Sequence, residues 1–220
     1  MSIKHWPEGE RPREKLLERG AGALSDAELL AVLLRVGTQG MSAVDMARSL
    51  LKQFGSLRGV MQADARELCR HKGMGTAAYA QFATVMEIGR RVLGEELQRQ
   101  PVFRSPEAAA GFLRLRIGSE KVEVGAALFL NAAAELIACE EISRGSTSEH
   151  RVYISTVARR ALHHHAAAVI FAHNHPSGSL TPSAEDLAFT RNLSDALALL
   201  EVRLLDHFIV SAQAVRSVYA

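Results

Sequence analysis

Two histidines and an aspartate in the last third of the chain are the residues best suited to chemistry. His173 and His175 stand one residue apart, just after a short apolar run at 166–171 that we interpret as a buried strand. Alternate residues of an extended segment point the same way, so both imidazoles can reach one point in space. Asp186 follows in the first turn of a predicted helix. Two imidazoles and one carboxylate are three ligands suited to zinc, with the fourth position left to water.

A purely structural role also accounts for part of this pattern. Two histidines at a strand end are more often exposed or hydrogen-bonded than bound to metal. Ser183 and Asp186 also fit a capping box, in which the serine caps the helix and the aspartate folds back on it. The combination of His, His, Pro, Ser and Asp at these intervals after an apolar strand favours the metal site.

This combination resembles the JAMM (MPN-plus) metallopeptidase motif, H-x-H-P followed by S-x-x-D. The variant H-N-H-P-S-G, with T-P-S before the helix, is similar to the RadC family in particular, and the resemblance covers nearly the whole chain. It implies a peptide or protein substrate and one Zn²⁺ per chain, held by His173, His175 and Asp186. It also implies that Ser183 caps the helix through its backbone while its hydroxyl donates a hydrogen bond to the oxyanion of the substrate.

A hydrolase of this kind needs a carboxylate that does not bind the metal, to take a proton from water and pass it to the leaving amine. In JAMM enzymes this glutamate stands where the first strand of the sheet begins. The matching position is Glu123, before the apolar run 124–130. A solvated charge at a strand entrance is the competing interpretation of Glu123. Glu140 and Glu141, at the end of the next predicted strand, are the alternative bases.

The N-terminal half carries helical patterns and one glycine-rich turn. Gly73 and Gly75 flank a single apolar residue between predicted short helices, and this pattern resembles a helix-hairpin-helix. A helix that begins after such a turn presents free backbone N–H groups that can hold a phosphate oxygen. Positions 76–78 carry no lysine, so a cation near the phosphate must come from Lys72 or from elsewhere. DNA is therefore a candidate partner, and a protein contact or a spacer role is the competing interpretation.

The element patterns predict two domains. Residues 1–97 form a helical domain, the polar and proline-flanked segment 94–106 is a linker, and residues 102–220 form an α/β domain. That second domain should fold as helix, hairpin, helix, strand, helix and strand, which makes a mixed sheet with helices against it. The resemblance implies the JAMM (MPN, cytidine-deaminase-like) fold. In the closing strand, Asp206-His207 resembles a pair that recurs in the RadC family, and we expect it to form hydrogen bonds rather than bind metal.

Composition and charge limit the remaining classes. The net charge is +2, and residues 1–99 hold 15 Lys and Arg against 12 Asp and Glu, so any affinity for polyanions is modest and lies in this half. Cys69 and Cys139 form no C-x-x-C pattern and are predicted to be buried, reduced thiols. No apolar run approaches the ~18 residues of a membrane helix. We therefore expect a cytoplasmic protein without a membrane segment.

These observations favour a zinc-dependent metallopeptidase that hydrolyses a peptide or isopeptide amide with an activated water. The alternative is a DNA-binding accessory protein of repair or recombination that acts through the N-terminal half, which predicts steeply salt-dependent binding. A zinc deaminase is disfavoured because neither H-x-E nor P-C-x-x-C is present.

Overall fold

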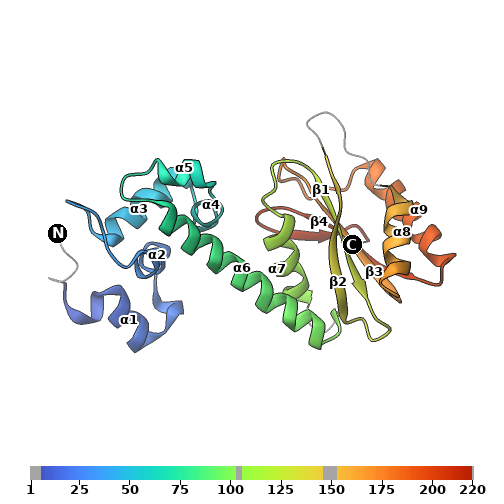
Figure 1. Cartoon of the computed structure of the whole chain (residues 1–220), viewed down its shortest axis with the longest axis horizontal. Helices are drawn as coiled ribbons and strands as arrows, with labels where there is room; N and C mark the ends of the chain where they lie inside the picture. Colours follow the sequence, from blue (N-terminus) through green and yellow to red (C-terminus); the bar gives the residue numbers. More distant parts are fainter. Residues whose placement is uncertain (1–5, 103–105, 146–152, 220) are drawn as a thin grey trace. The chain divides into compact units, whose positions relative to one another are not determined.

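The computed structural model describes residues 6–102, 106–145 and 153–219, which fall into two compact units, residues 1–87 and 88–220 (Figure 1). Helix α6, Thr76–Arg99, crosses this division. Our linker prediction was wrong for residues 94–99, because they form the last turns of α6. The helix continues there because Leu93 and Leu97, one turn apart, pack into the core of the second unit.

The first unit is a cluster of helices around its own apolar core. Its helices before α6 are α1 (Pro12–Arg19), α2 (Asp26–Leu34), α3 (Ala43–Phe54), α4 (Leu57–Met61) and α5 (Ala65–Cys69). Ser25 closes the predicted capping box at the start of α2, and Ser42 closes another at the start of α3. In the described part of the chain, no helix combines the length and the apolar character that crossing a membrane requires.

The second unit is built on a five-stranded sheet in the order β2-β1-β3-β4-β5. The strands are β1 (Val124–Leu130), β2 (Leu136–Arg144), β3 (Ala168–Asn174), β4 (Arg203–Val210) and β5 (Val215–Ser217). Only the β3–β4 pair is parallel among these pairings. The predicted fold class, a helical N-terminal region followed by a mixed α/β sheet, is confirmed. The sequence patterns had not indicated β5, which has three residues and no periodicity to read.

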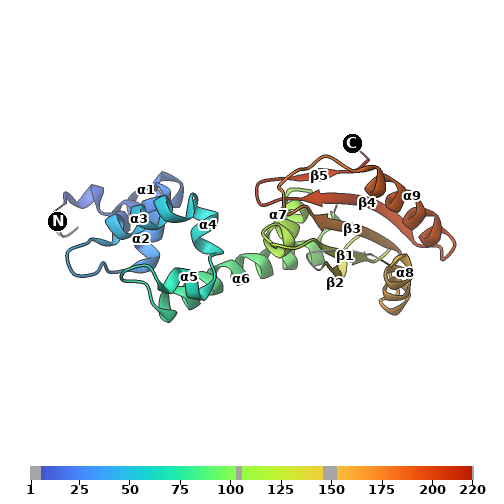
Figure 2. The same cartoon turned by 90° about the horizontal axis from the view of Figure 1, so that it is seen from above.

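Helices cover both faces of this sheet (Figure 2). Helix α7 (Pro106–Ile117) packs on one face, and α8 (Ile154–His163) and α9 (Ala184–Ala198) pack on the other. Val169 and Phe171 of β3 contact the core under α8 and α9, whereas Ile170 and Ala172 contact the core under α7. Since side chains alternate along a strand, His173 faces the side of α9 and the next residue faces the side of α7.

The unpaired state of the cysteines agrees with the sequence. Cys69 and Cys139 both carry free thiols, but both residues are only partly buried, so the prediction of full burial was wrong. Burial raises the pKa of the Cys139 thiol to about 11, so this thiol stays protonated at neutral pH.

A group of charged side chains ties α8 to the strand β2. Arg160 contacts Glu140 through its guanidinium, and His164 Nε2 lies 2.7 Å from Glu140 Oε1. The hydrogen bonds from Arg160, which outweigh the opposing effect of burial, lower the pKa of Glu140 to about 2. Glu140 is therefore ionised and paired in the folded protein.

Replacing Glu140 with glutamine should lower the free energy of unfolding by about 1 kcal/mol at neutral pH, a modest value because the pair is partly exposed. The folded-state pKa of about 2 lies below the ordinary glutamate value of 4.5, so the stabilisation is complete above that value and is lost as the pH falls toward the folded-state pKa. Urea unfolding of both proteins across this pH range measures the difference. In an Arg160→Gln background the Glu140 substitution should have a smaller effect, because among the described residues His164 is then the remaining partner of Glu140. A difference that stays constant as the pH falls would contradict the pairing.

Candidate metal centre

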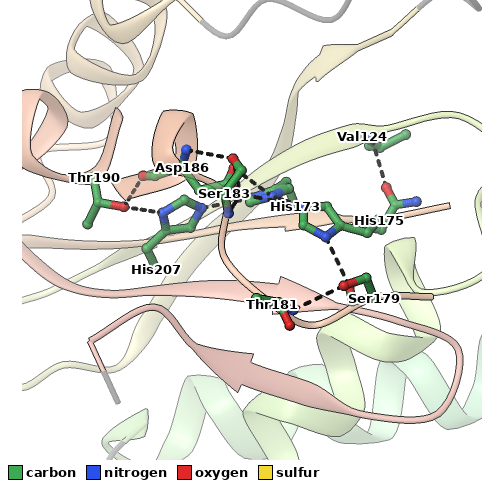
Figure 3. A network of polar contacts seen from close by, with 10 residues as sticks. Val124, His173, His175, Ser179, Thr181, Ser183, Asp186, Thr190 and His207 are labelled. Carbon is green, nitrogen blue, oxygen red and sulfur yellow. Dashed lines mark hydrogen bonds and ion pairs between the residues drawn. The ribbon is translucent and has the colours of Figure 1, made fainter. Parts of the chain in front are cut away.

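Three donor atoms from β3, the residue after it, and the start of α9 meet at one point (Figure 3). His173 Nε2 lies 2.9 Å from His175 Nε2 and 3.1 Å from Asp186 Oδ1. His175 Nε2 lies 3.7 Å from Asp186 Oδ2. Tetrahedral ligands of zinc, each about 2.0–2.1 Å from the ion, are about 3.3 Å apart. The two histidine–aspartate distances end on different oxygens of Asp186, and one donor atom from each of the three residues lies within 4.8 Å of the others. The predicted ligands are therefore brought close enough together to hold a metal ion.

The outer nitrogens of both histidines are engaged by the protein. His175 Nδ1 donates to the carbonyl oxygen of Ser179 at 2.9 Å, and a carbonyl can only accept, so in the neutral ring of His175 the lone pair is on Nε2. His173 Nδ1 lies 2.8 Å from His207 Nε2, which leaves Nε2 of His173 directed at His175 and Asp186. When both rings are neutral with their hydrogens on Nδ1, two nitrogen lone pairs and a carboxylate face one another at short range. A cation, either a metal ion or a proton on one Nε2, would relieve this repulsion, and nitrogen and oxygen donors in this number suit zinc.

The capping box orients the carboxylate of Asp186. Its Oδ2 accepts hydrogen bonds from Ser183 N and Ser183 Oγ, both at 2.7 Å. Its Oδ1 is thereby turned toward His173. Although burial alone would raise it, a hydrogen bond from His173, when a proton is on its Nε2, and those from Ser183 hold the pKa of Asp186 well below its usual value. The aspartate is thus an ionised and preoriented candidate ligand.

The hydroxyl of Ser183 has a more direct structural task than we expected. It accepts from Asp186 N at 3.0 Å and donates its single hydrogen to Asp186 Oδ2. The capping therefore uses the hydroxyl itself, so the expected division between a capping backbone and a free hydroxyl was wrong. Donation from Ser183 to a substrate oxyanion stays a prediction, and it requires the hydroxyl to turn away from Asp186.

A cavity of about 230 Å³ opens over the three candidate ligands. Glu123, the predicted general base, is one of its lining residues. The lining consists of Glu123, Phe171, His173, His175, Ser183, Glu185, Asp186, Phe189 and His207. The alternative bases are engaged elsewhere, Glu140 with Arg160 and Glu141 with Arg144, and neither belongs to this lining. Of the three glutamates considered, the fold thus brings Glu123 to the cavity.

Asn174, the residue between the two histidines, fixes the segment that carries Glu123. Its Oδ1 accepts from Val124 N at 2.7 Å, and its Nδ2 donates to the carbonyl oxygens of Glu120 and Val122, both at 3.1 Å. The side chain is 1% exposed, and all three of these hydrogen bonds end within 120–124. Asn174 was not among the predicted site residues. The signal for it is the strand alternation, which places the two histidines on one face and therefore sends the side chain between them to the opposite face.

Two further buried residues contact the candidate ligands from behind. His207 Nε2 contacts His173, and His207 Nδ1 lies 2.6 Å from Thr190 Oγ1. The hydrogen-bonding role expected for His207 is therefore confirmed. Burial, followed by repulsion from His173, lowers the pKa of His207 to about 3, so its ring is neutral at physiological pH. Thr190 was missed, although it stands one helical turn after Asp186 on the same face of α9.

The glycine-rich turn of the first unit has a packing role. Gly73 has φ +85°, and a Cβ built on it would lie 2.8 Å from Met46 Sδ, so only glycine fits there without rearrangement. Lys72 and Gly75 are exposed on either side, and α6 begins at Thr76. The proposed contact of Lys72, Gly73 and Gly75 with nucleic acid stays a prediction.

A helical region followed by a mixed sheet with a His-His-Asp group defines a JAB-type α/β domain with its N-terminal extension. Residues 103–220 match the family model of the RadC-like JAB domain, and residues 3–80 match the model of the UPF0758 N-terminal region. The chain belongs to the UPF0758 family.

Relatives in this family resemble the chain along nearly all of its length. A UPF0758 protein of Neisseria meningitidis serogroup C (strain 053442) is 60% identical over 217 residues, which cover 99% of this chain and 96% of that protein. UPF0758 proteins of Ralstonia nicotianae and Nitrosospira multiformis are 52% and 51% identical, with 99% of this chain and 97% of each relative covered. Their names state the family and no activity.

Replacing Asn174 with alanine should speed hydrogen exchange of the Val124 amide more than that of amides in the middle of β1. The free energy of unfolding should fall by about 1–3 kcal/mol, because buried polar groups lose their partner. Asn131→Ala is the matched control, since Asn131 accepts from Ala133 N and Glu135 N at the other end of the strand. It should leave the relative protection of Val124 intact. Equal protection of the Val124 amide in the wild type and in Asn174→Ala would contradict the proposed role of Asn174 in holding residues 120–124.

Proposed function

We propose that this protein is a zinc-dependent hydrolase that cleaves a peptide or isopeptide amide. The observation that carries the proposal is the convergence of His173 Nε2, His175 Nε2 and an oriented oxygen of Asp186 beside a cavity that also contains Glu123. The match to a JAB domain supports the same class of chemistry. When bound, zinc would acidify a water molecule and polarise the scissile carbonyl.

A residue of the chain would carry out the two proton transfers of the reaction. We assign Glu123 as general base: it takes a proton from the attacking water as the new carbon–oxygen bond forms. The same carboxylic acid returns that proton to the amide nitrogen as the carbon–nitrogen bond breaks. The products are a carboxylic acid and an amine, and Glu123 is regenerated as a carboxylate. This sequence consumes one water and needs no other reactant.

Two other parts of the cavity would assist the reaction. Ser183, released from Asp186, would donate to the oxyanion that develops on the carbonyl oxygen, and such a donor typically contributes about 100- to 1000-fold in rate. Phe171 and Phe189, whose ring centroids are 5.0 Å apart, form an apolar wall that limits water around the ligands. Both peptide and lysine-linked isopeptide amides suit this chemistry.

Zinc content tests the metal part of the proposal. The wild type, purified without added metal, should carry close to one zinc per chain, and the double variant His173→Ala with Asp186→Ala should carry almost none. Each of the two substitutions removes one of the three candidate ligands found among the described residues. Inductively coupled plasma mass spectrometry of the proteins after gel filtration measures the ratio of zinc to protein chains. Absence of zinc from the wild type after reconstitution at neutral pH would overturn the proposal.

The assignment of the base needs a variant that keeps the metal. Glu123→Gln should retain zinc but lose about 100- to 10,000-fold in rate against quenched fluorescent peptides and lysine-linked isopeptides. Glu185→Gln is a matched control, because it removes another carboxylate from the same cavity and should keep more than a tenth of the wild-type rate. Equal losses in the two variants would contradict the role of Glu123.

A further inference from the structure

We propose that Thr190 and His207 are positioning residues that hold His173 in the one ring tautomer able to bind a metal through Nε2. This inference rests on the proposed metal site and concerns how the chain maintains it. Thr190, His207 and His173 are 3%, 0% and 3% exposed, so the three groups exchange hydrogen bonds with one another rather than with solvent.

The hydrogen bond that Thr190 donates determines which groups donate and which accept along this series of contacts. Its Oγ1 donates to the carbonyl oxygen of Asp186 at 2.6 Å, one helical turn earlier. A hydroxyl has a single hydrogen, so toward His207 Nδ1, also 2.6 Å away, Thr190 can only accept. His207 must therefore carry its ring hydrogen on Nδ1.

The tautomer of His207 then decides that of His173. With its hydrogen on Nδ1, the neutral ring of His207 presents a lone pair at Nε2, which lies 2.8 Å from His173 Nδ1. Only an N–H on His173 Nδ1 makes this contact a hydrogen bond. In the neutral ring of His173, Nε2 is thereby left with its lone pair exposed to a metal, 3.1 Å from Asp186 Oδ1. The chain of contacts starts at the backbone carbonyl of Asp186 and returns to its carboxylate (Figure 3).

His175 shows why His173 needs such support. The acceptor for His175 Nδ1 is a backbone carbonyl, Ser179 O, which has no hydrogen and fixes the tautomer by itself. The partner of His173 is another imidazole, which can be donor or acceptor at the contacting nitrogen. The hydroxyl of Thr190 removes that ambiguity. This is the physical reason for a threonine at this buried position of α9.

The test compares Thr190→Val, which keeps the shape and loses the hydroxyl, with Thr190→Ser, which keeps the hydroxyl and loses a buried methyl. Zinc dissociation constants come from competition with a chromophoric chelator. Thr190→Val should bind zinc about 10- to 100-fold more weakly, as is typical when a metal ligand loses its supporting partner, and Thr190→Ser should stay within about threefold of wild type. A purely structural role predicts the opposite order, because serine leaves a cavity in the core.

Two further measurements separate positioning from stability. Urea unfolding of the metal-free proteins gives the stability difference, and long-range ¹H–¹⁵N spectra give the histidine tautomers. In metal-free wild type, His207 and His173 should both carry hydrogen on Nδ1, and Thr190→Val should lose this pattern. His207→Gln, which can still offer an acceptor to His173, should bind zinc more tightly than His207→Phe, which cannot.

Zinc affinity in Thr190→Val equal to wild type, or an equal loss in Thr190→Ser, would overturn the inference while leaving the proposed metal site in place. The opposite failure is also distinguishable. Wild-type protein that shows the tautomers and the valine effect on zinc, yet hydrolyses no amide, would support the positioning role and count against the peptidase.

Discussion

The second unit is organised around a contact that is repulsive when both of its imidazoles are neutral. Two imidazole nitrogens 2.9 Å apart and an ionised carboxylate oxygen face a common point, and the outer nitrogen of each ring is engaged by another group. Such an arrangement is unfavourable without a cation, because lone pairs and a negative charge are held together inside a partly enclosed cavity. The surrounding structure opposes relaxation at every ligand: a backbone carbonyl holds His175, an imidazole holds His173, and a capping box holds Asp186.

The side chains of β3 alternate between the two faces of the sheet, and this alternation produces the arrangement. Odd-numbered positions from Val169 face the core under α8 and α9, so His173 emerges beside the N-terminus of α9, where the capping box presents Asp186. The even position between the histidines faces the other way, and there Asn174 binds the backbone on both sides of Glu123. One strand end thus positions two candidate ligands and, through the opposite face, the candidate base. A shift of β3 by one residue would exchange these roles and destroy both.

The local features of the site could be read from the sequence, and the distant contacts could not. The apolar run before His173, the pairing of His173 with His175 and the Ser183–Asp186 box all depend on neighbours within a few residues, so their spacing carries the information. His207 reaches His173 because β4 lies parallel to β3 in a register that places Phe171 beside His207, and Thr190 reaches His207 because α9 packs against β4. That register depends on packing across the whole sheet, which a single sequence does not display.

The same distinction explains the errors elsewhere. The polar residues from Gly94 onward indicated a linker. However, Leu97 within this stretch is buried in the core of the second unit, and Leu93, one turn earlier, packs against the same core. The serine of the capping box was expected to spare its hydroxyl, yet Asp186 takes that hydrogen because both partners lie in one helical turn. Glu123 could be proposed from its place before the first strand, whereas its approach to the histidines depends on the buried amide of Asn174.

A crystal structure of protein purified without added metal, with anomalous data collected on both sides of the zinc absorption edge, would show whether zinc binds at the three candidate ligands. We expect one strong anomalous peak about 2.0–2.2 Å from His173 Nε2, His175 Nε2 and Asp186 Oδ1, with a fourth position open to the cavity. Zinc bound elsewhere, with these three side chains hydrogen-bonded only to one another, would contradict this expectation.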